Sequence, residues 1–258
     1  MEARSAAPRR RAARAHPLSG LAGAITFLTV APLPAVGAEL TAAAPWFPLV
    51  GAMIGLVAGG VRAAGQRLLH GHAPGSALAV GALVLLTGAL HQDGLADTAD
   101  ALGARGGREK RLEIMRDSSI GVFGALALIL WAMLLFSVVD VLSLSDALRA
   151  LVVAGALSRW AALLHAARTS PARSDGLGAA LQVGPGALGV ASVTALVIAL
   201  AVGDPGAGAA ALAATLLVAG GMSLYARRSL GGRTGDTLGA TVAIAEVAVC
   251  AVLCGIWH

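Results

Sequence analysis

The stretch His91-Gln92-Asp93-Gly94-Leu95-Ala96-Asp97-Thr98-Ala99-Asp100 follows directly on fifteen residues without a charged side chain, Ser76–Leu90. Its three carboxylates are spaced i, i+4 and i+7, so on a helix they fall within a sector of roughly 60°. Three like charges on one face repel each other unless a cation neutralises them. Oxygen ligands suit Mg²⁺, which proteins usually hold with one or two carboxylates together with substrate phosphates. The stretch therefore predicts a cation site at the end of a membrane helix.

The composition is that of a membrane protein. Hydrophobic residues make up 57% of the 258 residues, charged residues only 13%, and the mean hydropathy is +0.79. Soluble domains carry about 25% charged residues. We therefore expect an all-α polytopic membrane helix bundle with the lipid bilayer as a partner. The net charge of +5 does not indicate a nucleic-acid partner, because the basic residues cluster in loops, where they act as orientation signals.

Long apolar runs predict about seven transmembrane helices. They cover roughly residues 46–61, 76–90, 120–139, 147–166, 187–202, 206–226 and 238–257. The second run continues into the acidic stretch, and residues 62–75 before it are expected to form a loop. Residues 18–35 are short for a span and are broken by Pro32-Leu33-Pro34, so we expect a re-entrant or interfacial helix there. A signal peptide with its apolar region at Leu18–Ala31 is the alternative.

The basic residues predict the domain organisation and the orientation. Residues 1–17 hold several arginines among Ala and Pro and are expected to form a disordered cytoplasmic arm. Residues 18–258 are expected to form a single integral-membrane catalytic domain. Arg105–Asp117 gives the strongest positive-inside signal, so the acidic stretch is predicted to face the cytoplasm.

Further ionisable residues lie in or beside the apolar runs. Arg159 lies inside one, where a cation costs a few kcal/mol unless it is paired, wetted or snorkels to the interface. Glu246 lies in the last run, about two helical turns after the glycine-rich stretch Gly231–Gly239, which carries Asp236. Ionisable groups at membrane depth are functional-site hypotheses.

This set of residues suits phosphoryl or phosphodiester transfer, in which catalysis is mainly positioning and charge neutralisation. Carboxylates hold Mg²⁺, basic side chains bind phosphate, and glycine-rich backbone approaches the ligand closely. The expected metal ligands are Asp93, Asp97, Asp100, Asp236 and Glu246. The expected phosphate-binding residues are Arg116, Arg159, Gly232, Arg233, Thr234 and Gly235. The candidate catalytic residues are His91, Asp93, Asp97 and Asp100. The base is either His91 or an aspartate, although an ideal helix turns His91 about 160° away from Asp93.

Other interpretations of these residues stay open. The acidic helix end is either a solvated cap, a catalytic site or the cation site of a cation-coupled membrane transporter, although transporters place such sites near the midplane in repeated broken helices. His70-Gly71-His72 is either a metal pair or a polar loop. Cys250 and Cys254 are either packed thiols or an incomplete metal or redox pair.

Leu90–Gly103 resembles the signature of the cobalamin synthase family, the adenosylcobinamide-GDP ribazoletransferases. Further blocks resemble that family in the same order along the chain: Phe27-Leu28-Thr29, Trp46–Gly51, Arg111–Gly124, Ser158-Arg159-Trp160 and Gly232–Ala240. Val30 and Ala101 stand where the family often has Arg and Gly, and neither change removes an expected ligand.

The resemblance implies a Mg²⁺-dependent phosphotransferase in the bacterial inner (cytoplasmic) membrane, with several spans. Its substrates would be adenosylcobinamide-GDP and α-ribazole or its 5′-phosphate, and its products adenosylcobalamin or its 5′-phosphate and GMP. Whether it forms a homo-oligomer stays open. Asp93-Gly94-Leu95-Ala96 is also similar to the Asp-Gly-x-x-Ala pattern of CDP-alcohol phosphotransferases. A phospholipid enzyme of that type is therefore an alternative, although position 97 is Asp where that motif has Arg.

Overall fold

The structure, a computed structural model, describes residues 17–33 and 40–258. The predicted basic arm at residues 1–17 lies outside this part of the chain except for Pro17, which begins the first helix. The elements are α1 (Pro17–Leu28), α2 (Leu40–Ala43), η1 (Ala44–Trp46), α3 (Phe47–Leu68), α4 (His72–Thr87), α5 (Leu90–Gly103), α6 (Arg108–Ile114), α7 (Val122–Val141), α8 (Leu144–Arg168), α9 (Leu177–Ala180), α10 (Pro185–Val202), α11 (Pro205–Tyr225), η2 (Ala226–Leu230, a π-helical turn) and α12 (Gly235–Trp257).

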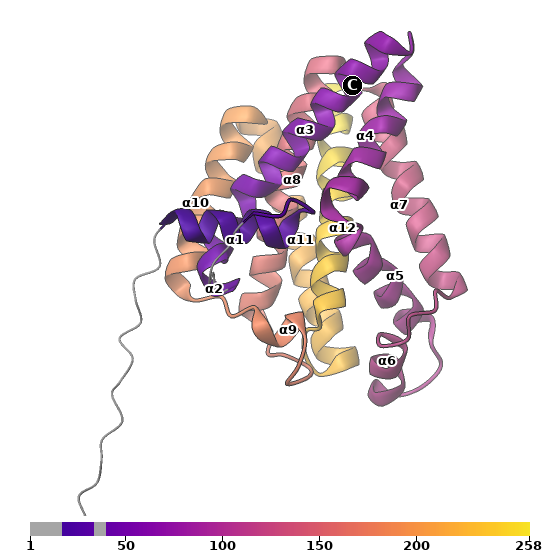
Figure 1. The fold of residues 1–258 in the computed structure, drawn as a ribbon, viewed down its shortest axis with the longest axis vertical. Coiled ribbons are helices and arrows are strands. Elements are labelled where there is room, and N and C mark those ends of the chain that lie inside the picture. Colours follow the sequence, from indigo (N-terminus) through magenta and orange to yellow (C-terminus); the bar gives the residue numbers. More distant parts are fainter. Residues whose placement is uncertain (1–16, 34–39) are drawn as a thin grey trace, which may run out of the picture.

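The all-α membrane bundle is confirmed: the described residues form helices and contain no β-strand. Six helical segments are long and apolar enough to cross a membrane: Leu40–Leu68, Val122–Val141, Leu144–Arg168, Pro185–Val202, Pro205–Leu230 and Gly235–Trp257. The pair α4 and α5 adds a seventh if it is counted as one broken span. Figure 1 shows the long helices side by side and α1 lying across them.

Helix α8 forms the centre of the bundle, with α3 and α12 packed against it. Of the 18 residues in its most apolar stretch, 83% are buried inside the structure, against 22% for α7 at the periphery. A Cβ added to Gly51 of α3 would lie only 2.1 Å from the backbone oxygen of Gly155 in α8. Glycines therefore let these two helices touch backbone to backbone, the close packing that small residues permit in membranes.

The expected continuous run from the second span into the acidic stretch is wrong. Helix α4 ends at Thr87, and α5 leaves at an angle of 91° to it. Gly88 and Ala89 both adopt left-handed backbone conformations, with φ of 59° at each. A left-handed alanine costs about 1–2 kcal/mol. This turn swings the acidic helix out of the direction of α4 and against α12.

The expected loop at residues 62–75 is also wrong over most of its length. Helix α3 continues to Leu68, and α4 begins at His72. Arg62 is fully buried, and its guanidinium donates to the Leu142 carbonyl at 2.9 Å and to the Ser76 hydroxyl at 3.3 Å. These acceptors from neighbouring elements let the Arg62 guanidinium lie buried in the bundle. Residue 62 can therefore be part of a helix, where the sequence alone favours a loop.

The loops that follow α6, α8 and η2 meet at one end of the bundle. Arg108 of α6 donates to the Leu230 carbonyl at 2.8 Å and to the Ala172 carbonyl at 3.1 Å. Arg116 pairs with Asp175 at 3.1 Å, and both side chains are more than half exposed. We call this the basic end of the bundle; Figure 1 shows α6 and α9 here, far from the C-terminus.

Candidate active site

Asp93 of α5 and Asp236 of α12 are brought together by two glycines. A Cβ on Gly94 would lie 2.6 Å from the backbone oxygen of Asp236, and one on Gly239 would lie 3.3 Å from the Leu90 carbonyl oxygen. The two helices are thus in backbone contact at the first turn of α12. The loop Gly231–Gly239 and the acidic stretch, predicted to converge, therefore do form one site.

Gly94→Ala should lower catalytic activity by about 100-fold without removing any charge. The added methyl group meets backbone rather than a flexible side chain, so α5 must shift relative to α12, and a misplacement of about 1 Å can cost that much. Activity and far-UV circular dichroism of the purified variant would check this. Gly81→Ala in α4 is the matched control, because a Cβ there meets nothing within 4 Å; equal activity losses in both variants would contradict the account.

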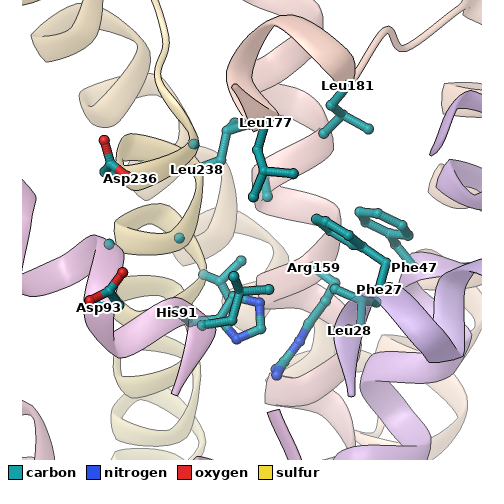
Figure 2. A pocket seen from close by; sticks show the side chains of 16 residues that line it. Phe27, Leu28, Phe47, His91, Asp93, Arg159, Leu177, Leu181, Asp236 and Leu238 are labelled. Carbon is teal, nitrogen blue, oxygen red and sulfur yellow. The ribbon is translucent and has the colours of Figure 1, made fainter. Parts of the chain in front are cut away.

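Two cavities meet at Asp93 and Asp236. The first, which we call the polar cavity, has a volume of about 490 Å³ and is lined also by Asp97 and by the segment Met115–Ile120. The second, the apolar cavity, has a volume of about 110 Å³, and its walls are mainly Phe27, Leu28, Phe47, Leu181, Leu238 and Val242. Figure 2 shows the carboxylates of Asp93 and Asp236 on one side of the apolar cavity and the two phenylalanines on the other. The acids form a wall shared by the two cavities.

Three carboxylates, those of Asp93, Asp97 and Asp236, lie together at the shared wall and repel one another. The charges of Asp93 and Asp236 both act on Asp97. Arg173, in the loop after α8, partly offsets them through a contact of 3.4 Å with Asp236. In the described residues no three Asp, Glu, His or Cys side chains are already grouped as a metal site. These oxygens still fit Mg²⁺, because that ion keeps several waters and is usually bound through only one or two carboxylates.

Asp100 has a different environment from the other acids of its helix. Its carboxylate oxygens accept hydrogen bonds from the backbone N–H groups of Gly121 at 2.8 Å and Gly124 at 2.9 Å. These groups belong to the first turn of α7, whose unpaired N–H groups and positive dipole end favour a negative charge. The structure thus gives Asp100 a helix-capping position, although it was expected to share the metal with Asp93 and Asp97.

Asp100→Asn should therefore keep most of the catalytic rate and lose only part of the cap. An amide oxygen still accepts one N–H, whereas removing a cap costs about 0.5–2 kcal/mol. The measurement is the midpoint of thermal unfolding together with the rate, for Asp100→Asn beside Asp100→Ala. A rate loss in Asp100→Asn as large as that of the same change at Asp97 would show that Asp100 does bind the metal.

Arg159 and Glu246 form a buried ion pair. Arg159 Nη1 lies 2.7 Å from Glu246 Oε1, and the side chains are 1% and 4% exposed. Arg159 is therefore paired inside the bundle and does not snorkel to the interface. It also lines the apolar cavity, near His91. Glu246 was expected among the metal ligands, and here its carboxylate binds Arg159.

Arg233 is occupied by backbone carbonyls. Its guanidinium, 4% exposed, donates to Gly178 O at 2.9 Å, Ala166 O at 3.0 Å and Leu181 O at 2.8 Å, and also to the Thr169 carbonyl. It thereby ties the end of α8 and the α9 region to the start of α12, where Asp236 lies. The expected phosphate contact would have to replace these bonds, so the structure gives Arg233 a positioning role.

The residues on either side of Arg233 shape the same turn. Gly232 has φ of 159°, and a Cβ there would lie 2.4 Å from the Ser170 carbonyl oxygen. Thr234 begins α12 with a capping box, in which its hydroxyl accepts from the N–H of Thr237 and the Thr237 hydroxyl accepts in return. Gly235 lines the apolar cavity. This turn fixes the position of Asp236 rather than presenting a free phosphate loop.

His91 is buried, with 4% exposure, and lines the apolar cavity together with Asp93. Figure 2 shows the Asp93 carboxylate pointing away from the imidazole, in keeping with the large angle between them on an ideal helix. A hydroxyl group held between the shared wall and His91 would have a candidate base within the cavity.

Several site residues were not expected from the sequence. Arg173 sits in a polar loop with no motif of its own, and only the fold brings it to Asp236. Phe27 and Phe47 stack with ring centroids 5.6 Å apart and form the far wall of the apolar cavity. Both lie in sequence blocks that resemble the cobalamin synthase family, which was the available signal. Asp117 lines the polar cavity, and hydrogen bonds from the Ser119 hydroxyl and N–H lower its pKa, so it stays ionised at neutral pH.

The remaining candidate metal pairs lie outside this site. His72 begins α4 and faces a different cavity, beside Asp140 and Trp257. Cys250 is buried, and both cysteines carry free thiols. They lie on α12, and Cys250 contacts the Ala150 carbonyl at 3.9 Å, as a packed thiol would.

Comparison with known proteins identifies relatives along almost the entire chain. The chain is 40% identical over 247 residues to an adenosylcobinamide-GDP ribazoletransferase of Roseiflexus sp. (strain RS-1), covering 92% of this chain and 90% of that protein. It is 39% identical over 246 residues to the protein of that name from Azorhizobium caulinodans, with 90% and 93% covered. No solved structure matches it. The cobalamin-5-phosphate synthase model matches residues 20–254, a range that contains both acids of the shared wall and the walls of both cavities, and the chain therefore belongs to that family.

Proposed function

We propose that this protein joins adenosylcobinamide-GDP to α-ribazole or its 5′-phosphate, giving adenosylcobalamin or its 5′-phosphate and GMP. The observation that carries the proposal is the acidic wall of Asp93 and Asp236 between two cavities. A transferase with two substrates needs both of them at one reacting phosphorus, and this wall offers one place with a space on either side. Membership of the cobalamin-5-phosphate synthase family supports the choice of substrates.

We infer that Asp93, Asp97 and Asp236 hold Mg²⁺ when the substrates bind. The ion would neutralise charge on the pyrophosphate of adenosylcobinamide-GDP, as metal ions do in phosphoryl transfer. The chemistry of the donor set supports this inference, because three carboxylates without a matching set of cations favour a divalent ion. Arg173 offsets only part of their charge.

The transfer is a substitution at phosphorus. A ribose hydroxyl of α-ribazole forms a bond to the phosphorus next to the aminopropanol arm, and the bond from that phosphorus to the oxygen bridging to GMP breaks. The hydroxyl proton passes to His91 or to an aspartate of the wall, and the bridging electron pair leaves with GMP. The chain's main contribution is positioning, since both helices that carry the acids are fixed by backbone contacts.

The membrane character of the helices and the charges of the loops support a multi-pass protein of the bacterial inner membrane whose active site faces the cytoplasm. Basic side chains gather at the end that carries the polar cavity: Arg108, Lys110, Arg111, Arg116, Arg173, Arg227 and Arg228. The opposite end carries Asp146 in the first turn of α8 and Asp204 just before α11, and both pair with Arg149. This asymmetry is the one that the positive-inside rule associates with the cytoplasmic side.

The test is an assay of the purified protein in lipid vesicles with adenosylcobinamide-GDP, α-ribazole and Mg²⁺. The expected nucleotide product is GMP, formed together with a corrinoid that carries the ribazole. Vesicles without protein are the control. Product formation from a CDP-alcohol substrate in place of GMP release, or solute movement without any nucleotide product, would replace the proposal by the phospholipid enzyme or the transporter.

A further inference from the structure

The apolar cavity has the chemistry of a binding site for an aromatic ring. Phe27 and Phe47 stack on each other at one wall, and Leu181, Leu238 and Val242 supply the rest. Its polar lining residues are His91, Asp93, Arg159 and Asp236. Figure 2 shows the two aspartates at the end away from the phenylalanines and Arg159 close to the phenylalanines. A mainly apolar pocket with carboxylates at one end orients a ligand that has an apolar body and a polar tail. The tail must then point at the acidic wall.

On the proposed function, we infer that this cavity takes the dimethylbenzimidazole ring of α-ribazole, and that the polar cavity takes the phosphate side of adenosylcobinamide-GDP. The base is a bicyclic aromatic benzimidazole with two methyl groups. One of its ring nitrogens carries the ribose, and the other is free to accept a hydrogen bond. The ribose attached to it is the polar tail. Placed this way, the ribose hydroxyls lie toward Asp93 and the shared wall, where the substitution occurs.

The other parts of the two substrates do not suit the apolar cavity. Guanine carries several donors and acceptors around its edge, and burying them without partners costs several kcal/mol. The corrin macrocycle is far larger than a space of about 110 Å³. That volume is also below the roughly 150 Å³ of a cavity that holds benzene. The bicyclic base therefore requires an outward shift of Phe27, which lies on the short peripheral helix α1.

Arg159 provides a partner for the one acceptor of the ring. Its side chain is 1% exposed, and its Nε is buried with no hydrogen-bond acceptor in the described part of the chain. A buried donor without a partner is costly, so a ligand that supplies an acceptor gains affinity by satisfying it. The ion pair with Glu246, made through Nη1, leaves this Nε–H free to donate.

The experiment uses the full-length protein in vesicles and free 5,6-dimethylbenzimidazole as probe. The base should compete with α-ribazole and should not compete with adenosylcobinamide-GDP. Val242→Phe, which fills the cavity, should raise the KM for α-ribazole about tenfold. The KM for adenosylcobinamide-GDP should stay within about twofold. Val57→Phe, on the exposed face of α3, is the control and should change neither value.

Different results would contradict the proposed function and the assignment of the substrates to the two cavities. If the wild-type protein releases no GMP from any substrate pair, the proposed function is wrong. If the wild type is active but the base competes with adenosylcobinamide-GDP, or Val242→Phe raises the KM for that substrate instead, the assignment of the cavities is overturned. Unchanged KM values for both substrates in Val242→Phe would show that the apolar cavity binds neither.

Discussion

Asp97→Asn should lower the rate of GMP release by about 100- to 1,000-fold, the loss that follows removal of one well-placed electrostatic group. Asp97 lines the polar cavity beside Asp93 and Asp236. The amide keeps the shape of the side chain but removes the negative charge that would hold Mg²⁺. Because the change also relieves repulsion among the acids, the protein should insert and fold at least as well as the wild type.

The check is a comparison of Asp97→Asn with Asp100→Asn under the same conditions. The sequence presents these residues as equivalent members of one acidic face. The structure separates them, because the Asp100 carboxylate accepts the N–H groups of Gly121 and Gly124. A near-normal rate for Asp97→Asn would remove it from the metal site, and raising the Mg²⁺ concentration should restore part of the activity if it is a ligand.

Arg159→Met should destabilise the protein by about 3–5 kcal/mol, because it leaves the Glu246 carboxylate buried among apolar helices without a partner. The double variant Arg159→Met with Glu246→Met should regain most of that loss, since replacing both members of a buried pair by apolar residues is often neutral or stabilising. Thermal unfolding in detergent and the fraction of protein that elutes as folded material would measure both.

The matched control for the buried pair is Arg116→Met, which breaks the exposed pair with Asp175. Exposed pairs contribute about 0–1 kcal/mol, so little change in stability is expected there. If Arg159→Met and Arg116→Met destabilise equally, or if the double variant is no more stable than the single one, the pair does not contribute as a buried ion pair.

The helices of this protein could be predicted closely from the sequence where apolar runs have clear boundaries. Residues 187–202 were expected for the helix found at Pro185–Val202, and 120–139 for the one at Val122–Val141. Proline, glycine and charged residues mark both. The turn at Gly88 and Ala89 contains no proline that would predict it, and the helix that follows it, α5, packs against α12 through Gly94.

The site could be predicted as a set of residues but not as an assignment of roles. Helical spacing correctly put Asp93, Asp97 and Asp100 on one helix, α5. Their separate partners come from tertiary structure: Gly121 and Gly124 are more than twenty positions away from Asp100. Likewise, charge alone suggests phosphate binding for Arg233. Only the fold shows the carbonyls of Gly178 and Leu181 around its guanidinium.

The most direct test of the central claim is the stoichiometry of products from the wild-type protein in vesicles. We expect one GMP for each corrinoid joined to ribazole, only when both substrates are present, and loss of both products after chelation of Mg²⁺. GMP released at the same rate without α-ribazole would indicate a hydrolase, and a joined corrinoid formed at full rate without a divalent ion would contradict the role given to the shared acidic wall.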